Sequence, residues 1–342
     1  MKIFTSLMMG ASLVFSLLAN FASAAAPREI RVLAFNTWQL KAFGLELAED
    51  RLDRLKLIPD MIAGTGADII ALSEVWKNST KKLLAKELAE RGYPYSFYTL
   101  RKAGMGDGLL ILSKHPIGES EKSKVFHPKT MTDELITSKR AYHVVVQVSG
   151  VGPVDFFSTH LGAVEFDEKK DAYNEHQQDE LATQMLEFAT FIKDNRTSPY
   201  AIAAGDLNAH YQVYSAKGRF EPVYSKPYSA MIAGACSAGT LINTYLAVHG
   251  MDEKSPAVPT YSQENPYVGG GYFSEIPSEV EDYIFQCPSA TLRPVRSERM
   301  FVDAIPDSAR EAYGLKKLPK RLSDHFGMMT TFSFSEVEAD RH

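Results

Sequence analysis

Several polar residues stand directly after short apolar runs, and their types suit metal or phosphate chemistry. They are Asn36, Glu74, His160, Asp206, Asn208, Asp282, Asp324 and His325. Sheet architectures collect reactive groups at strand ends, so residues placed there can converge on one site. The set is rich in hard oxygen donors and nearly free of sulfur, which favours Mg²⁺ over zinc. Each residue alone has an ordinary structural explanation, such as a turn or a helix start, and only the whole set indicates a site.

Two of these residues are predicted to share one edge of a parallel sheet. Residues 30–35 are typical of a strand ending at Asn36, and residues 68–72 of a strand ending shortly before Glu74. Between them, apolar residues recur at helical spacing from Leu47 to Ile62. A strand, helix, strand order implies a right-handed crossover with both carboxyl ends on the same edge, so Asn36 and Glu74 should face one cleft.

The remaining apolar runs predict an order that mixes crossovers with hairpins. Helices are expected after Asn78 and around residues 177–193, and a turn at residues 149–153 should join an antiparallel hairpin. Further strands are expected at residues 95–100, 108–113, 142–148, 154–159, 200–204, 282–286 and 326–334. This mixture predicts the α/β class, as a four-layer α/β sandwich of two packed mixed β-sheets flanked by helices.

Six short motifs hold the polar residues in a fixed order. They are Phe35-Asn36-Thr37, Leu72-Ser73-Glu74, Ser158-Thr159-His160-Leu161, Gly205-Asp206-Leu207-Asn208, Asp282-Tyr283-Ile284-Phe285 and Ser323-Asp324-His325. In this order, and over essentially the whole mature chain, they resemble the endonuclease/exonuclease/phosphatase superfamily. The segment from Gly108 to Pro116 is similar to a seventh family element, a strand and turn preceding a proline. The resemblance implies the deoxyribonuclease-like form of the sandwich.

The resemblance also implies a metal-assisted attack of water on a phosphodiester. Glu74 would be the principal Mg²⁺ ligand, with Asn36 beside it and Mn²⁺ or Co²⁺ as substitutes for the ion. His325 would be the general base that takes a proton from the water, because an imidazole can work near neutral pH. Asp282 would orient that ring and raise its basicity.

Four further roles are implied for the residues around this base. Asp206 would position the water or bind metal, and Asp324 would support the metal side. Asn208 and His160 would donate hydrogen bonds to the charge that develops on the phosphate.

The flanking segments are similar to bacterial secreted sphingomyelinases, which implies hydrolysis of sphingomyelin to ceramide and phosphocholine at a membrane surface. Pro259-Thr-Tyr-Ser262 and Asp282-Tyr-Ile-Phe285 carry this similarity. Where those enzymes have a membrane-dipping hairpin, this chain has Tyr261, Tyr267, Gly269-Gly-Gly271, Tyr272 and Phe273. Such rings could enter the headgroup region of a bilayer, but in a β-rich protein aromatic residues more often belong to the core. This stretch lacks their tryptophan pair, and Ser138-Lys139-Arg140 stands where many of them have Lys-Gly.

Two other functions remain open. A secreted deoxyribonuclease-like endonuclease would take nucleic acid as its substrate, and the run Lys316-Lys-Leu-Pro-Lys-Arg321 could bind its phosphates, although a solvated loop explains the run as well. A non-catalytic binding module would lack a catalytic group, and none is missing. No obligate protein partner is indicated.

The N-terminus and the composition indicate an exported protein. Residues 1–24 have one cation, an apolar run and Ala22-Ser23-Ala24, which predicts a secretory signal peptide; an uncleaved anchor is the alternative. Residues 25–342 would form a single catalytic domain in the periplasm or outside the cell. The net charge of −5 argues against broad binding to a nucleic-acid backbone. Cys236 and Cys287 fit one disulfide or two buried thiols equally well.

Overall fold

The computed structural model describes residues 29–335 except 43–44, 102–104, 119–120, 128–136, 168, 171, 212, 215–219, 222–225, 238, 257 and 271–275. The predicted signal peptide, residues 1–24, lies outside the described residues, so it stays a prediction. Among the helices of the described part, none has the length and apolar character needed to cross a bilayer.

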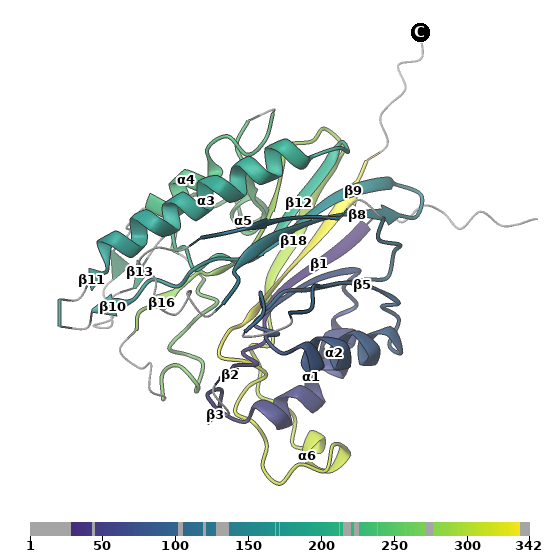
Figure 1. Cartoon of the computed structure of the whole chain (residues 1–342), viewed down its shortest axis with the longest axis vertical. Helices are drawn as coiled ribbons and strands as arrows, with labels where there is room; N and C mark the ends of the chain where they lie inside the picture. The colour runs from purple at the N-terminus through teal and green to yellow at the C-terminus, as the bar shows by residue number, and fades with distance from the viewer. Residues whose placement is uncertain are drawn as a thin grey trace, which may run out of the picture.

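Two large mixed sheets form the centre of the molecule (Figure 1). In spatial order, sheet I consists of β18 (Leu292–Met300), β19 (Gly327–Phe334), β1 (Glu29–Asn36), β4 (Ile69–Ser73), β6 (Leu110–Ser113) and β5 (Tyr95–Phe97). Sheet II consists of β15 (Ile242–Asn243), β17 (Asp282–Gln286), β12 (Tyr200–Asp206), β9 (Gly152–His160), β8 (Arg140–Val148) and β7 (Lys122–Val125). In each sheet a parallel pair lies beside antiparallel neighbours.

Helices cover the outer faces of both sheets. In Figure 1, α1 (Arg51–Thr65) and α2 (Asn78–Ala89) lie on the side of sheet I, and α3 (Glu175–Asn195) and α4 (Lys226–Ile232) on the side of sheet II. The shorter helices are α5 (Thr244–His249) and α6 (Ser308–Ala312). Small ladders join β2 (Lys41–Ala42) to β3 (Leu45–Glu46), β10 (Phe166–Asp167) to β11 (Ala172–Tyr173), and β13 (Val213–Tyr214) to both β14 (Phe220–Glu221) and β16 (Ser278–Glu279).

The alternation of side chains along each strand builds separate cores on the two faces of a sheet. On β1, Val32 and Ala34 lie in the core between the sheets, whereas Leu33 and Phe35 face the core under α1 and α2. Both faces of these central strands are buried. Their sequences are therefore continuous apolar runs and do not alternate between apolar and polar residues. A third core joins sheet II to α3. The predicted four-layer sandwich of two mixed sheets and flanking helices is therefore confirmed.

One expectation for an individual element was wrong, and one strand has no counterpart among the predicted elements. The helix predicted from Leu47 begins only at Arg51, because Leu47 belongs to the chain leaving β3 and its amide donates to the Leu40 carbonyl. The edge strand β18 was not predicted at all. It contains Pro294, where the pairing with β19 is irregular, and its charges are tolerated because only one side of it is paired.

Two local features hold sheet II together. Cys236 and Cys287 form a disulfide. Of the two states that the sequence allowed, one disulfide or two buried thiols, the structure therefore has the disulfide. Gly205 has φ +146°, and a Cβ atom there would lie 2.0 Å from the Thr159 carbonyl oxygen. The close approach of β12 to β9 directly before Asp206 therefore requires glycine.

Candidate active site

Strand register in sheet II places three of the predicted site residues side by side. Asp206 ends β12, and it is paired with His160 at the end of β9 and with Asp282 at the start of β17. All three are buried. Parallel and antiparallel neighbours thus deliver an imidazole and two carboxylates to the same edge.

The strands of sheet I place further predicted site residues at the same edge. Asn36 pairs with Ser73 across the parallel strands β1 and β4, so Glu74 follows directly beside it, as expected. Glu74 has φ +60°, a conformation that is uncommon outside glycine and that surrounding contacts must hold. Asp324 and His325 precede β19, the other neighbour of β1.

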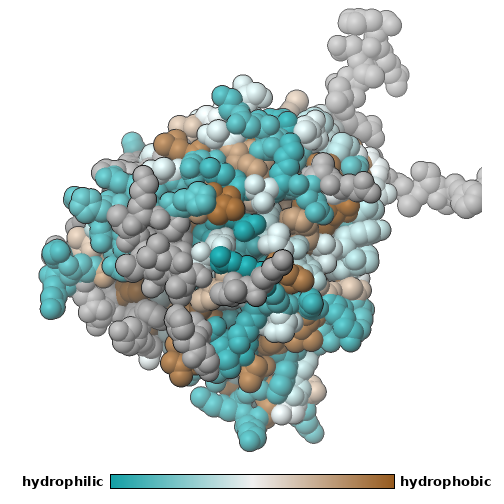
Figure 2. Space-filling model, viewed as in Figure 1, coloured by the Kyte–Doolittle hydropathy of each residue, from teal (hydrophilic) through white to brown (hydrophobic). Residues whose placement is uncertain are grey.

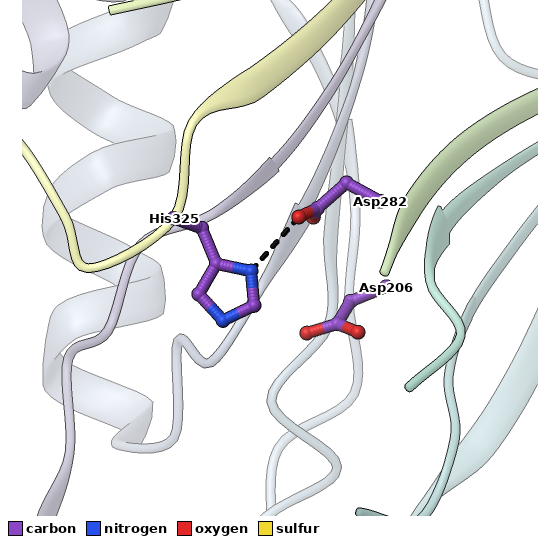
Figure 3. A group of neighbouring side chains, drawn as sticks. All are labelled: Asp206, Asp282 and His325. Atoms are coloured by element: carbon purple, nitrogen blue, oxygen red, sulfur yellow. Dashed lines mark hydrogen bonds and ion pairs between the residues drawn. The ribbon is translucent and has the colours of Figure 1, made fainter. Parts of the chain in front are cut away.

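His325 and Asp282 join the two halves directly. The His325 Nδ1 atom lies 2.8 Å from Asp282 Oδ2 (Figure 3). The backbone of Asp282 and Glu281 is fixed by Thr260, because both backbone amides donate to Thr260 Oγ1 at 3.0 Å. If Nδ1 donates to the carboxylate, the lone pair of Nε2 is left facing the site, which is the arrangement that a general base needs.

The pKa values of this pair reflect burial and crowding of acids. Burial alone would lower the pKa of His325, but the carboxylates of Asp282 and Asp324 raise it well above its ordinary value. Burial raises the pKa of Asp282 to about 6, although the neighbouring His325 opposes that rise. The pair therefore takes up a proton readily, and a cation close to the acids would oppose that uptake.

Asn36 and Asn208 fix the position of Asp206. The Asn36 Nδ2 atom donates to Asp206 Oδ2 at 2.8 Å and lies 3.4 Å from His325 Nε2. The backbone amide of Asn208 donates to Asp206 Oδ1 at 3.0 Å, and its side chain donates to the Leu161 carbonyl at 2.9 Å. Asp206 thus spans the seam between the sheets, and Figure 3 shows its carboxylate beside the His325 ring.

The donor set fits a divalent metal ion. Asp206, Asp282 and His325 each offer a ligand atom within 4.8 Å of the others. Because His325 and Asp282 are hydrogen-bonded to each other, the carboxylates that remain for an ion include Asp206 and, on the side of sheet I, Glu74 and Asp324. Burial and the neighbouring Glu74 raise the pKa of Asp324 to about 6, with His325 acting in the opposite direction. Asp282 Oδ1 is buried without a hydrogen-bond partner among the described residues. Crowded buried carboxylates with an unused oxygen suit a hard cation.

A profile of the Endonuclease/Exonuclease/phosphatase family matches residues 33–325. The chain belongs to this family. The match runs from β1 to His325, so it includes all eight predicted site residues. Together with the sphingomyelin phosphodiesterases among its relatives, it supports a metal-dependent phosphodiester hydrolase, as predicted.

Curated relatives of this family member include sphingomyelinases. The chain is 27% identical over 198 residues to a putative neutral sphingomyelinase of Caenorhabditis elegans, covering 54% of this chain and 42% of that protein. It is 31% identical over 197 residues to the one of Drosophila melanogaster, covering 55% and 41%. The match thus spans less than half the length of these relatives.

Solved structures share the fold at low sequence identity. The crystal structure of SmcL has a TM-score of 0.63 and 16% identity, covering 90% of this chain and 99% of that one. Beta toxin from Staphylococcus aureus with bound magnesium ions has a TM-score of 0.59 and 16% identity, covering 90% and 100%. D. rerio TDP2 with a single-strand DNA product has a TM-score of 0.59 and 14% identity, covering 89% and 99%.

Lys139 is a site residue that the sequence reasoning did not select. Its Nζ atom lies 2.7 Å from His160 Nε2 and 2.8 Å from the Leu161 carbonyl. An ammonium group can only donate, so Nε2 of His160 accepts and cannot itself donate to a phosphate. Burial, followed by Lys139, lowers the pKa of His160 well below its ordinary value, which keeps the ring neutral. The Ser138-Lys139-Arg140 segment was noted only as a departure from the family pattern.

Glu281 is the second unpredicted group at the site. Its Oε2 atom lies 3.7 Å from His325 Nε2, on the side of the ring opposite Asp282. Burial and the neighbouring Glu279 raise the pKa of Glu281 well above its ordinary value. Burial also raises the pKa of Glu279 to about 8 and lowers that of His210, which lies 3.1 Å away, to about 4. No local pattern marks these residues in the sequence.

Two aromatic residues of the segment compared with the membrane hairpin lie in the core, the alternative that the sequence left open. Tyr261 is buried and its ring centroid lies 5.2 Å from that of His325. Tyr267 is also buried, against Trp38. These two rings therefore support the site from inside instead of contacting a bilayer. Tyr272 and Phe273, at the centre of the expected hairpin, lie outside the described residues.

Proposed function

We propose that the protein is a Mg²⁺-dependent phosphodiesterase that hydrolyses sphingomyelin to ceramide and phosphocholine, in the manner of a phospholipase C. The observation that carries the proposal is the His325–Asp282 pair facing crowded carboxylates at the seam between two sheets. The sphingomyelinase relatives support the choice of substrate.

The chain's own residues supply the proton chemistry. His325 takes the proton of the attacking water at Nε2, and Asp282 stabilises the imidazolium that results. Lys139, held between His160 and the Leu161 carbonyl, places a positive charge where the phosphate gains negative charge. When bound among Glu74, Asn36 and the neighbouring acids, Mg²⁺ would neutralise phosphate oxygens and the leaving alkoxide.

We also propose that the protein acts outside the cytoplasm. The Cys236–Cys287 disulfide supports this location, because such bonds persist in oxidising compartments and are rare in reducing ones. The pattern of residues 1–24 adds independent support.

A parallel substrate assay tests the function. Purified protein with Mg²⁺ is incubated separately with sphingomyelin, phosphatidylcholine and plasmid DNA. Phosphocholine release from sphingomyelin, with plasmid left intact, is the expected result. Plasmid nicking without lipid turnover would instead favour the deoxyribonuclease-like endonuclease, the alternative that the sequence leaves open. His325→Ala should abolish turnover of whichever substrate is cleaved, and near-normal turnover by this variant would overturn the assignment of the base.

A further inference from the structure

Three leucines close together in the sequence are unusually exposed. Leu45 is 63% exposed, Leu47 is 50% exposed and Leu52 is 57% exposed. Leu45 lies on β3 beside Glu46, and Leu47 directly follows the strand. Leu52 lies in the first turn of α1. In Figure 2 apolar side chains are visible at the lower left, where Figure 1 places the β2–β3 hairpin. We refer to these three residues as the leucine ridge.

Charges at the base of the leucine ridge are paired with one another. Glu46 forms ion pairs with both Lys41 and Arg51, which also holds the hairpin against the start of α1. Lys320 pairs with Glu49 at 3.1 Å. Two cations share the Glu46 carboxylate, so the named pairs leave a net charge of only one beside the leucines. So small a net charge suits a zwitterionic surface better than a strongly charged partner.

The leucine ridge is connected to the active site through the chain that leaves β1. The chain runs from Asn36 through Trp38 and Leu40 into the hairpin, and it returns at Ala48, whose amide donates to the Leu40 carbonyl. Trp38 and Ala48 share a small core with Tyr267. The ridge therefore projects from the same loop that leaves the metal-side strand β1.

We infer that the leucine ridge docks the protein on a phosphocholine-headgroup bilayer, with the three side chains inserted among the headgroups and the active site held against the surface. The inference rests on the proposed function, because a lipid phosphodiester must be reached from the bilayer plane. Leucine side chains gain free energy on leaving water, and three at one edge act together. The ridge provides a docking element that is separate from the segment around Tyr272 and Phe273.

Vesicle binding without turnover tests this inference. The full chain is mixed with vesicles of sphingomyelin and phosphatidylcholine in EDTA, and the bound fraction is measured by flotation. Leu45→Ser/Leu47→Ser/Leu52→Ser should bind about tenfold more weakly or worse. A matched control changes Leu83, Leu186 and Val295 to Ser, residues that are 43%, 50% and 49% exposed on α2, α3 and β18. The control should bind like the wild type.

The outcomes separate docking from catalysis. Equal binding by the ridge variant and the wild type overturns the inference, as does equal loss in the control. A wild-type dimer that the ridge substitutions dissociate would assign the leucines to a protein interface and also overturn it. If the triple variant is misfolded, Leu45→Ser alone should still weaken binding, since this side chain is the most exposed of the three. Ridge-dependent binding without sphingomyelin cleavage would refute only the proposed substrate.

Discussion

Removing the Arg54 guanidinium should destabilise the loops that frame the active site. The Arg54 side chain is completely buried, and it donates to four backbone carbonyls. They belong to Glu49 at 3.0 Å, Thr37 at 2.8 Å, Trp38 at 2.6 Å and Leu322 at 3.0 Å. Thr37 follows Asn36 and Leu322 precedes the Ser323-Asp324-His325 motif, so one side chain ties both halves of the sheet I site together.

The magnitude follows from the carbonyls left without a donor in Arg54→Met. Glu49 is exposed, so water can replace its lost hydrogen bond. The Thr37 carbonyl keeps a second donor, Gln39 Nε2 at 3.1 Å. The carbonyls of Trp38 and Leu322 belong to buried residues, and leaving such groups unsatisfied costs about 1–3 kcal/mol each. Some relaxation is expected, so the free energy of unfolding should fall by about 2–5 kcal/mol in total. That is a large part of a typical stability of about 5–15 kcal/mol.

Urea unfolding followed by circular dichroism measures this loss, and Arg51→Met is the matched control. Arg51 lies on the same helix, but its partner Glu46 is solvent-exposed, so its loss should cost at most about 1 kcal/mol. If the two variants unfold within about 1 kcal/mol of each other, the carbonyls around Arg54 are not the source of stability argued above. Enzyme activity should fall in Arg54→Met even under conditions where the variant stays folded.

Three further predictions concern the site and the fold. Asp282→Asn should keep the contact to His325 but lose the charge that stabilises the imidazolium, lowering kcat on a soluble phosphodiester about a thousandfold; an unchanged kcat would contradict this role. Asp282 and Asp324 have pKa values of about 6, so Mg²⁺ should raise the Tm more near pH 7.5 than near pH 5, where protons compete for the carboxylates. Thermal shift assays test this, and a larger rise at the lower pH would refute it. Cys236→Ala/Cys287→Ala should lose about 4 kcal/mol, from the chain entropy of a 51-residue loop, in equilibrium unfolding; an unchanged midpoint would count against that estimate.

The fold class could be predicted because local patterns and long-range order agree. The apolar runs of β1 and β4, and the amphipathic helix between them, indicate a parallel crossover by themselves. What local patterns do not contain is the pairing of β1 with β19, nearly the whole chain away. Edge strand β18 escaped prediction because Arg293, Pro294 and Arg296 resemble a loop, and its strand conformation depends on pairing with β19.

The mutual proximity of the expected residues could be predicted where a short motif marks them, while their roles stay predictions. All eight expected residues come from such motifs, and the structure brings them to one edge. Lys139 and Glu281 were missed because their roles depend on tertiary distance, to His160 in one case and to His325 in the other. The cysteine pairing was likewise undecidable, since only the folded chain shows that Cys236 and Cys287 meet.

The order of strands along the chain has a consequence for how activity arises during synthesis. Sheet I begins with β1, β4, β5 and β6, is interrupted by all of sheet II, and is completed only by β18 and β19. The base His325 arrives just before the last strand. A nascent chain therefore cannot assemble the site, or close sheet I, until the segment from His325 to the end of β19 has emerged.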